Sequence, residues 1–345
     1  MRRMLGRLAL VAASVFLTLL GTEGLLRVTT APTWLQEGNP ITEWLVTDPL
    51  LGWTNRPGFA DENVSINSLG FRGTELAPAR KQGVRRLVCL GDSGTFGLWV
   101  EERDAEGVVH YDGYVDQLRR LVDSESHGRI EIINAGVNGY TSSHVLRLLE
   151  TRIVDLDPDI IVVRVGLNDH KRATAHLTVT DPSNTFLRWA LRRFANWRLT
   201  RASFHAARLA RPRRAGKHTG PWVSLERFRL DLKRIAELSK SHGFSLLFVD
   251  YPLRSPTLPS HPHHTKILGL AGHSKREDFD RLHDQYQAVL GEVAREAGVP
   301  LVQTRKRLRQ PADFPNADFV HPNTRGARKI AESIWVALLA SGDLK

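Results

Sequence analysis

A serine, a histidine and an aspartate of this chain have the types and spacing to carry acyl-transfer chemistry. Ser93 follows a short apolar run, in the sequence GDSGTFG, and His321 lies near the other end of the chain, in DFVHPN. A serine hydroxyl is a weak nucleophile until a base removes its proton, and histidine is the most frequent base. Asp318, three residues before His321, can reach the other imidazole nitrogen and fix the tautomer. These residues therefore predict reaction through a covalent acyl-serine.

Acyl transfer also requires hydrogen-bond donors for the negative oxygen that develops on the acyl group. Three groups fit that need: the backbone N–H of Ser93, the backbone N–H of Gly136 in NAGVNG, and the side-chain amide of Asn168 in GLND. Glycine at 136 lets the backbone approach a substrate because no Cβ intervenes. Taken singly, Asn168 is more typical of a turn and His321 of an ordinary histidine, so the prediction depends on their combination.

Strand-like and helix-like segments alternate along the chain and must position these residues. Runs of β-branched and aliphatic residues predict five strands, at 85–90, 130–134, 160–165, 245–249 and 299–303. Apolar residues spaced by three and four predict helices, one of them capped by Ser224 and ended by Gly243. Such alternation favours right-handed crossovers between parallel strands. We therefore expect an α/β fold, a three-layer α/β/α sandwich with a mostly parallel sheet of about five strands.

The candidate site residues share one edge of the expected sheet. Ser93, Gly136 and Asn168 follow the first, second and third strands, and Asp318 and His321 precede the final helix. Ligands of an open α/β sheet bind outside the carboxyl ends of its strands. We therefore expect these residues to close into one cleft although they lie far apart in the chain.

The segments GDSGTFG, NAGVNG, GLND and DFVHPN resemble the four sequence blocks of the SGNH hydrolases, also called GDSL-type esterases and lipases, in order and approximate spacing. They span residues 91–323, about two-thirds of the chain. The resemblance implies a flavodoxin-like fold. It also implies a role for each site residue: Ser93 is the nucleophile and an oxyanion donor, Gly136 and Asn168 are further oxyanion donors, and Asp318 and His321 complete the triad.

The resemblance leaves the substrate open. Gly94 and Thr95 stand where the namesake motif has leucine, a departure also seen among bacterial esterases and acetyltransferase-like members. The segment INSLGFRG and the apolar N-terminus are similar to those of membrane-tethered bacterial relatives, whose middle insertions differ.

Residues 1–30 have the pattern of a signal anchor. Three arginines precede an uncharged apolar run at 8–21, which reaches spanning length if a helix continues to Val28. Because no clear A-x-A cleavage site follows, we expect an uncleaved transmembrane helix, with secretion after cleavage as the alternative. The arginines place the N-terminus in the cytoplasm and the remaining chain outside it, periplasmic or extracellular.

Three further regions follow the anchor. Residues 31–82 are rich in turn formers and predict a connector with an extended elaboration, and residues 83–345 form the expected catalytic domain. Within that domain, 171–220 is strongly basic with apolar residues at helical spacing, which predicts a helical insertion. Its basic side is either an ordinary solvated face or a surface that lies on anionic membrane.

Composition excludes several classes of site. The formal charge is +11, yet no nucleic-acid-binding motif accompanies it, so we expect no nucleic-acid partner. The single cysteine, Cys89, rules out a disulfide within the chain and a cysteine-based metal site. Four histidines, 261, 263, 264 and 273, lie in the stretch 251–274, which is more typical of a mobile loop than of a zinc site. We expect neither a metal nor a cofactor.

The first functional hypothesis is an extracytoplasmic serine esterase or deacylase that hydrolyses an O-acyl ester, with a short acyl group on a carbohydrate or lipid. An O-acyltransferase acting on a cell-envelope or exported polysaccharide would share its first step, because the choice between water and a sugar hydroxyl depends on water exclusion and acceptor binding. A catalytically dead carbohydrate-binding or scaffold protein is the third hypothesis.

Overall fold

The computed structural model describes residues 2–28, 43–77, 80, 82–98, 101–103, 109–126, 129–171, 220–256, 261–308 and 310–342. Its chain falls into two units, one with residues 1–56 and 178–215 and one with residues 57–177 and 216–345. The predicted basic insertion lies outside the described residues, apart from its two ends.

The described part of the first unit contains a helix and a hairpin. Helix α1 (Arg2–Val28) forms where the sequence predicts a transmembrane helix. None of the described helices, however, is long and apolar enough to cross a membrane, so that part of the prediction is not supported. Strands β1 (Leu45–Asp48) and β2 (Gly52–Asn55) pair antiparallel, and the Asp48 carboxylate accepts two backbone N–H groups of the turn between them.

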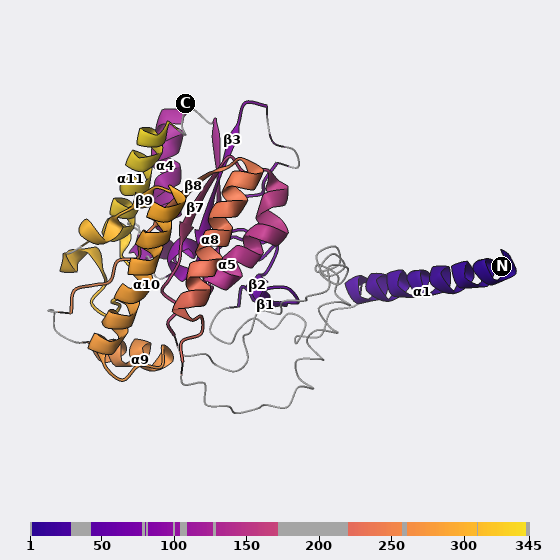
Figure 1. Cartoon of the computed structure of the whole chain (residues 1–345), viewed down its shortest axis with the longest axis horizontal. Coiled ribbons are helices and arrows are strands. Elements are labelled where there is room, and N and C mark those ends of the chain that lie inside the picture. Colours follow the sequence, from indigo (N-terminus) through magenta and orange to yellow (C-terminus); the bar gives the residue numbers. More distant parts are fainter. Residues whose placement is uncertain are drawn as a thin grey trace. The chain divides into compact units, whose positions relative to one another are not determined.

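A parallel sheet lies at the centre of the second unit, between helices (Figure 1). It has five strands. Its order is β6 (Ile130–Gly136), β3 (Arg85–Gly91), β7 (Ile160–Arg164), β8 (Ser245–Val249) and β9 (Leu301–Val302). Every neighbouring pair is parallel. The strands coincide with the five predicted runs, which confirms the α/β fold with a parallel sheet.

Helices cover the sheet on both faces. Helices α4 (Tyr114–Ser126) and α11 (Thr324–Ser341) pack together over one face, where Leu87 and Cys89 of β3 join their apolar core. Helices α5 (Ser142–Leu148), α8 (Leu225–His242) and α10 (Arg276–Ala297) lie over the other face (Figure 1). Burial of alternate strand residues on both faces explains why the strands read as continuous apolar runs.

Local signals set the ends of several helices. Ser224 caps α8 by accepting the N–H of Arg227, and Gly243 ends it at a φ of 76°, both as predicted. The loop expected at 251–274 is wrong in part, because α9 (Pro262–Leu270) forms there. His261 accepts the N–H of His263 and Pro262 occupies the first helical position, so these residues start a helix rather than a mobile loop.

The remaining elements among the described residues are short. They are α3 (Ser93–Phe96), the antiparallel pair β4 (Glu101–Arg103) and β5 (Val109–Tyr111), a π-helical turn at Leu149–Ile153, and 3-10 turns at Val154–Leu156, Thr304–Lys306 and Pro311–Asp313.

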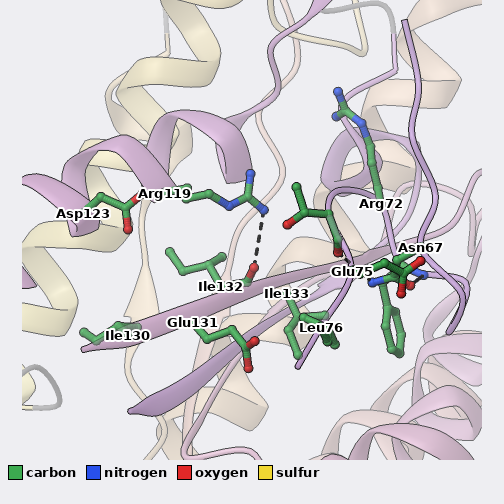
Figure 2. Close-up of a pocket in the computed structure, with 12 residues that line it drawn as sticks. Asn67, Arg72, Glu75, Leu76, Arg119, Asp123, Ile130, Glu131, Ile132 and Ile133 are labelled. Atoms are coloured by element: carbon green, nitrogen blue, oxygen red, sulfur yellow. Dashed lines mark hydrogen bonds between the residues drawn. The ribbon is translucent and has the colours of Figure 1, made fainter. Parts of the chain in front are cut away.

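The segment before the sheet packs on edge strand β6. The N–H of Arg72 donates to the carbonyl of Asn134 at 3.0 Å, which extends the sheet by one bridge. A cavity of about 180 Å³ lies between this segment, α4 and β6, and Figure 2 shows Arg119 donating to the carbonyl of Ile132 in it. No candidate site residue lines this cavity. It is lined by Asn67, Phe71, Arg72, Thr74, Glu75, Leu76, Arg119, Asp123 and Ile130 to Ile133.

Candidate active site

Ser93 begins a short helix at the carboxyl end of β3. The strand stops at Gly91, and Asp92 is the N-cap of α3, with extended backbone and its carboxylate accepting the N–H of Gly94 at 2.9 Å. Gly97 ends α3 in the left-handed region at a φ of 90°. The turn therefore presents the Ser93 side chain at the sheet edge where the sequence predicts it.

Histidine 321 reaches Ser93 from the loop that precedes α11. Its Nε2 lies 2.9 Å from Ser93 Oγ, and its Nδ1 lies 2.7 Å from Asp318 Oδ2. A carboxylate can only accept, so Nδ1 carries the proton and the Nε2 lone pair faces the serine hydroxyl. This is the tautomer that a general base needs.

Asp318 is fixed and ionised. Its Oδ1 accepts the N–H of Val320 at 2.7 Å and the N–H of His321 at 3.1 Å, which leaves Oδ2 for the imidazole. Burial acts to raise the pKa of this carboxyl, but His321 and the two backbone N–H groups outweigh it and hold the pKa below its usual value. The charge behind the imidazole is thus present at neutral pH.

Asn168 lies beside the same site, on the turn after β7. Its amide Nδ2 donates to Asp92 Oδ2 at 3.1 Å and to the carbonyl of Tyr140 at 2.9 Å. The turn itself is tied down by the buried Asp169, which accepts the N–H groups of Gly166 and Ser142. Burial raises the pKa of Asp169 to about 7. The amide is therefore held rigidly near Ser93.

Asp92 connects these groups. The carboxylate is fully buried and accepts three donors: the N–H of Gly94, the amide of Asn168 and, at 3.3 Å, the hydroxyl of Tyr251. Burial raises its pKa, and the charge of Arg164 is the largest effect in the opposite direction. Arg164 and Tyr251 are not recognisable as site residues from the sequence, because an arginine that ends a strand and a tyrosine that follows one carry no chemical pattern.

Gly136 has a packing role in the structure. Its N–H donates to Asn134 Oδ1 at 3.1 Å, and a Cβ at this position would lie 2.2 Å from the backbone nitrogen of Phe96. The residue lets α3 lie directly on β6. The turn that follows contains a second glycine of the same block, Gly139, partly exposed at a φ of 81° and next to the Tyr140 carbonyl that holds Asn168.

The predicted histidine cluster has a structural role where it is described. His261 caps α9, and His264 Nε2 contacts the carbonyl of Asn316 at 3.0 Å. Within the described ranges, no group of three or more His, Cys, Asp or Glu side chains is arranged to hold a metal ion.

Comparisons with known proteins identify a family and several proteins to which this chain is similar. The model of the GDSL-like Lipase/Acylhydrolase family matches residues 89–329. A curated relative, the uncharacterized lipoprotein YqeF of Bacillus subtilis (strain 168), is 23% identical over 228 residues, which cover 66% of this chain and 73% of the relative.

Solved structures of similar shape include three hydrolases. LAE5, an alpha/beta hydrolase enzyme from the Lake Arreo metagenome, is 18% identical with a TM-score of 0.47, covering 76% of this chain and 96% of its own. Axe2, an acetylxylan esterase from Geobacillus stearothermophilus, is 19% identical with a TM-score of 0.44, and the match covers 74% of this chain and 95% of Axe2. The lipase/acylhydrolase from Enterococcus faecalis is 17% identical with a TM-score of 0.45, and the match covers 75% of this chain and 97% of that protein.

The family match covers more than half of the chain and includes every block that carries a candidate site residue. The chain therefore belongs to the GDSL-like lipase/acylhydrolase family and is a serine hydrolase of SGNH type that acts on ester bonds.

Proposed function

We propose that the protein hydrolyses an O-acyl ester through an acyl-enzyme on Ser93, with His321 as general base and acid and Asp318 as its orienting carboxylate. The observation that carries this proposal is the unbroken chain from Ser93 Oγ to His321 Nε2 at 2.9 Å and from His321 Nδ1 to Asp318 Oδ2 at 2.7 Å. A catalytically dead protein has no need to keep the three side chains in this order.

In the first half-reaction, Ser93 Oγ bonds to the acyl carbon while its proton passes to His321 Nε2. The electrons of the carbonyl double bond move to its oxygen, which becomes an oxyanion. Collapse of this intermediate breaks the bond to the alcohol, and the alcohol oxygen takes the proton from His321. The acyl group then remains on Ser93.

In the second half-reaction, water replaces the alcohol. His321 takes a proton from the water as the oxygen attacks the acyl carbon, and returns it to Ser93 Oγ when the intermediate collapses. The products are the free acid and the original enzyme. The ionised Asp318 favours both proton transfers, because it stabilises the imidazolium that forms each time.

We propose the N–H of Ser93, the amide of Asn168 and the N–H of Gly139 as the oxyanion donors. Gly139 replaces Gly136 in this role because Gly136 is buried and its α-carbon lies against the backbone of α3, which leaves no room for a substrate oxygen. Gly139 is partly exposed and belongs to the turn that Asn168 holds. A donor in a rigid, preorganised turn costs no rearrangement during reaction.

We propose a substrate with a short acyl group on a carbohydrate or lipid, outside the cytoplasm. The arginines and apolar run of residues 1–21 support export, and the relative from Bacillus subtilis is named a lipoprotein. Fractionation of cells that express the full chain tests the location, since recovery only with cytoplasmic proteins contradicts it.

The activity itself is tested with the purified full chain. We expect labelling by a fluorophosphonate probe and turnover of an ester series in which acyl length varies, with the free acid released. Release is measured with and without an oligosaccharide acceptor, because an O-acyltransferase forms acylated oligosaccharide at the expense of free acid. Absence of both labelling and turnover in a folded sample contradicts the proposal.

A further inference from the structure

Arg164 is a cation buried beneath the candidate nucleophile. The side chain, at the end of β7, is fully buried, and its Nε, Nη1 and Nη2 have no hydrogen-bond partner among the described residues. Its guanidinium stacks on the ring of Tyr251, 3.7 Å from the centroid. Arginine keeps its proton in proteins, and a buried charge is costly without compensation. A compensating charge must therefore lie nearby.

The guanidinium lies against the residue that follows Ser93. A Cβ at Gly94 would stand 2.3 Å from Arg164 Nη1 and 2.4 Å from the hydroxyl oxygen of Tyr251. Any side chain at position 94 would thus occupy the space of the guanidinium. Gly94 is also the place at which this sequence departs from the leucine of the namesake motif, so the departure makes room for the cation.

The candidate for this charge is the buried carboxylate of Asp92. It accepts from Gly94, Asn168 and Tyr251 and has no direct ion pair within 4.0 Å among the described residues. Arg164 and Asp92 share two neighbours. The guanidinium stacks on the ring of Tyr251, whose hydroxyl donates to Asp92, and it lies against Gly94, whose N–H also donates to Asp92. The charge of Arg164 acts to lower the pKa of Asp92 against the effect of burial. The other titratable groups facing Asp92 are Tyr251, His321, Lys171, Tyr114 and Asp169.

We propose that Arg164 is a positioning residue of the active site: its charge balances the Asp92 carboxylate, and that carboxylate holds the start of α3 and the amide of Asn168 in place. A protonated Asp92 would carry an O–H on one oxygen, and that oxygen would no longer accept freely. Either the cap at Gly94 or the contact with Asn168 would then weaken. The inference rests on the proposed function, because that proposal gives Ser93 and Asn168 their roles.

The test compares pH profiles of fluorophosphonate labelling and of ester kcat/KM. Removing the positive charge makes Asp92 easier to protonate, so activity is lost at a higher pH. We expect Arg164→Met to shift the acid limb upward by about one pH unit, because loss of the opposite charge that acts on Asp92 favours its protonated form. Arg164→Lys keeps the charge and should leave the limb near its wild-type position. Circular dichroism confirms that each variant is folded.

The matched control is Arg86→Met. Arg86 is also a buried arginine on the sheet, but it lies near the start of β3 and pairs with Glu131 at 2.8 Å. We expect this variant to lower stability and leave the acid limb in place. An equal shift in Arg86→Met and Arg164→Met overturns the proposal.

A double-mutant cycle gives a second measurement. Asp92→Asn alone leaves Arg164 without a countercharge, and we expect at least a tenfold loss of labelling rate. In the Arg164→Met background, Asp92→Asn should lower the labelling rate about threefold or less, since both charges are gone. The upward shift of the acid limb should also disappear. Should Arg164→Met fail to fold, Arg164→Met/Asp92→Asn must restore folding and labelling.

The outcomes separate the two proposals. A wild-type protein that neither labels nor hydrolyses any ester contradicts the proposed function. The role of Arg164 alone is overturned if three results occur together: the wild type labels, the losses of labelling rate in the double-mutant cycle are additive, and the acid limb of Arg164→Met does not move.

Discussion

His321 Nε2 lies 2.9 Å from Ser93 Oγ although 228 residues separate the two in the chain. Ser93 starts α3 directly after β3, and His321 lies just before α11, whose cap Asn323 accepts the N–H of Gly326. The contact thus joins two separate elements at one edge of the sheet. It can form only when β3, α11 and the sheet between them are folded, so the reactivity of Ser93 reports on the whole second unit.

Ser93→Ala should abolish fluorophosphonate labelling and ester turnover while leaving the melting temperature nearly unchanged. Among the described residues, the Ser93 hydroxyl hydrogen-bonds only to His321, and the loss of one oxygen leaves no large cavity. Ser124→Ala, which removes an exposed hydroxyl bonded to the carbonyl of Leu121, is the matched control and should label like the wild type. Turnover retained by Ser93→Ala would refute its assignment as the nucleophile.

Asp318→Asn should lower kcat/KM by roughly 10³ to 10⁴, as loss of the orienting carboxylate does in other serine hydrolases. The N–H groups of Val320 and His321 both donate to Oδ1, so the asparagine oxygen must take that place. Its NH₂ then faces His321 Nδ1 and favours the wrong tautomer, with the proton on Nε2. Steady-state kinetics measure the loss, and an unchanged rate would show that the imidazole does not depend on Asp318.

Asn168→Ala should lower kcat by about 10² to 10³ with little change in KM, because an oxyanion donor acts in the transition state. Asn63→Ala, at a turn elsewhere in the second unit, is the control. Steady-state kinetics on one readily hydrolysed ester give kcat and KM separately. A kcat equal to that of the wild type would show that Asn168 is a turn residue and not an oxyanion donor.

Gly136→Ala should destabilise the protein by about 1 to 3 kcal/mol, as overpacking of a tight core does. The added Cβ meets the backbone of Thr95 and Phe96, which cannot move aside as a flexible side chain can. In Gly291→Ala, the matched control in α10, the added Cβ lies 3.7 Å from Leu301, an ordinary contact, so stability should hold or rise slightly. Urea denaturation measures both, and equal stabilities would contradict the packing role of Gly136.

The sequence predicted the sheet and the meeting of the site residues for one physical reason. Parallel strands buried on both faces leave long apolar runs, and their carboxyl ends must share an edge. Ser93, Asn168, Asp318 and His321 therefore came together as expected. The cap at Ser224 was readable because capping depends on a few neighbouring residues.

Other features depend on packing that a linear pattern does not contain. The segment NAGVNG has two glycines with different roles: Gly136 leaves space for α3, and Gly139 lies in the turn. Only their surroundings in the folded protein distinguish them. The buried state of Arg164 runs against the usual exposure of arginine, and its one trace in the sequence is the missing side chain at Gly94. Helix α9 was not predicted, because proline and histidine are common in loops. Here Pro262 instead occupies the first position of the helix.

Two buried histidines predict how stability depends on pH. Burial lowers the pKa of His283 to about 4 and the pKa of His144 to about 3, from the ordinary histidine value of about 6.5. The pKa values of both histidines are lower in the folded protein than in the unfolded chain. At a pH between the folded and unfolded values, the unfolded chain therefore binds more protons. The stability they contribute is present above pH 6.5 and is lost as the pH falls toward 4. Each group can add up to about 1.4 kcal/mol per pH unit to the slope in that window.

Urea denaturation between pH 7 and pH 4.5 measures this slope. His283 donates to the carbonyl of Tyr251 at 2.8 Å, and glutamine can donate there without titrating, so His283→Gln should reduce the slope by about one proton. Ser124→Ala, which removes an exposed hydroxyl and no titratable group, is the control and should leave the slope unchanged. Equal slopes in the wild type and His283→Gln would mean that His283 binds its proton as readily in the folded protein as in the unfolded chain.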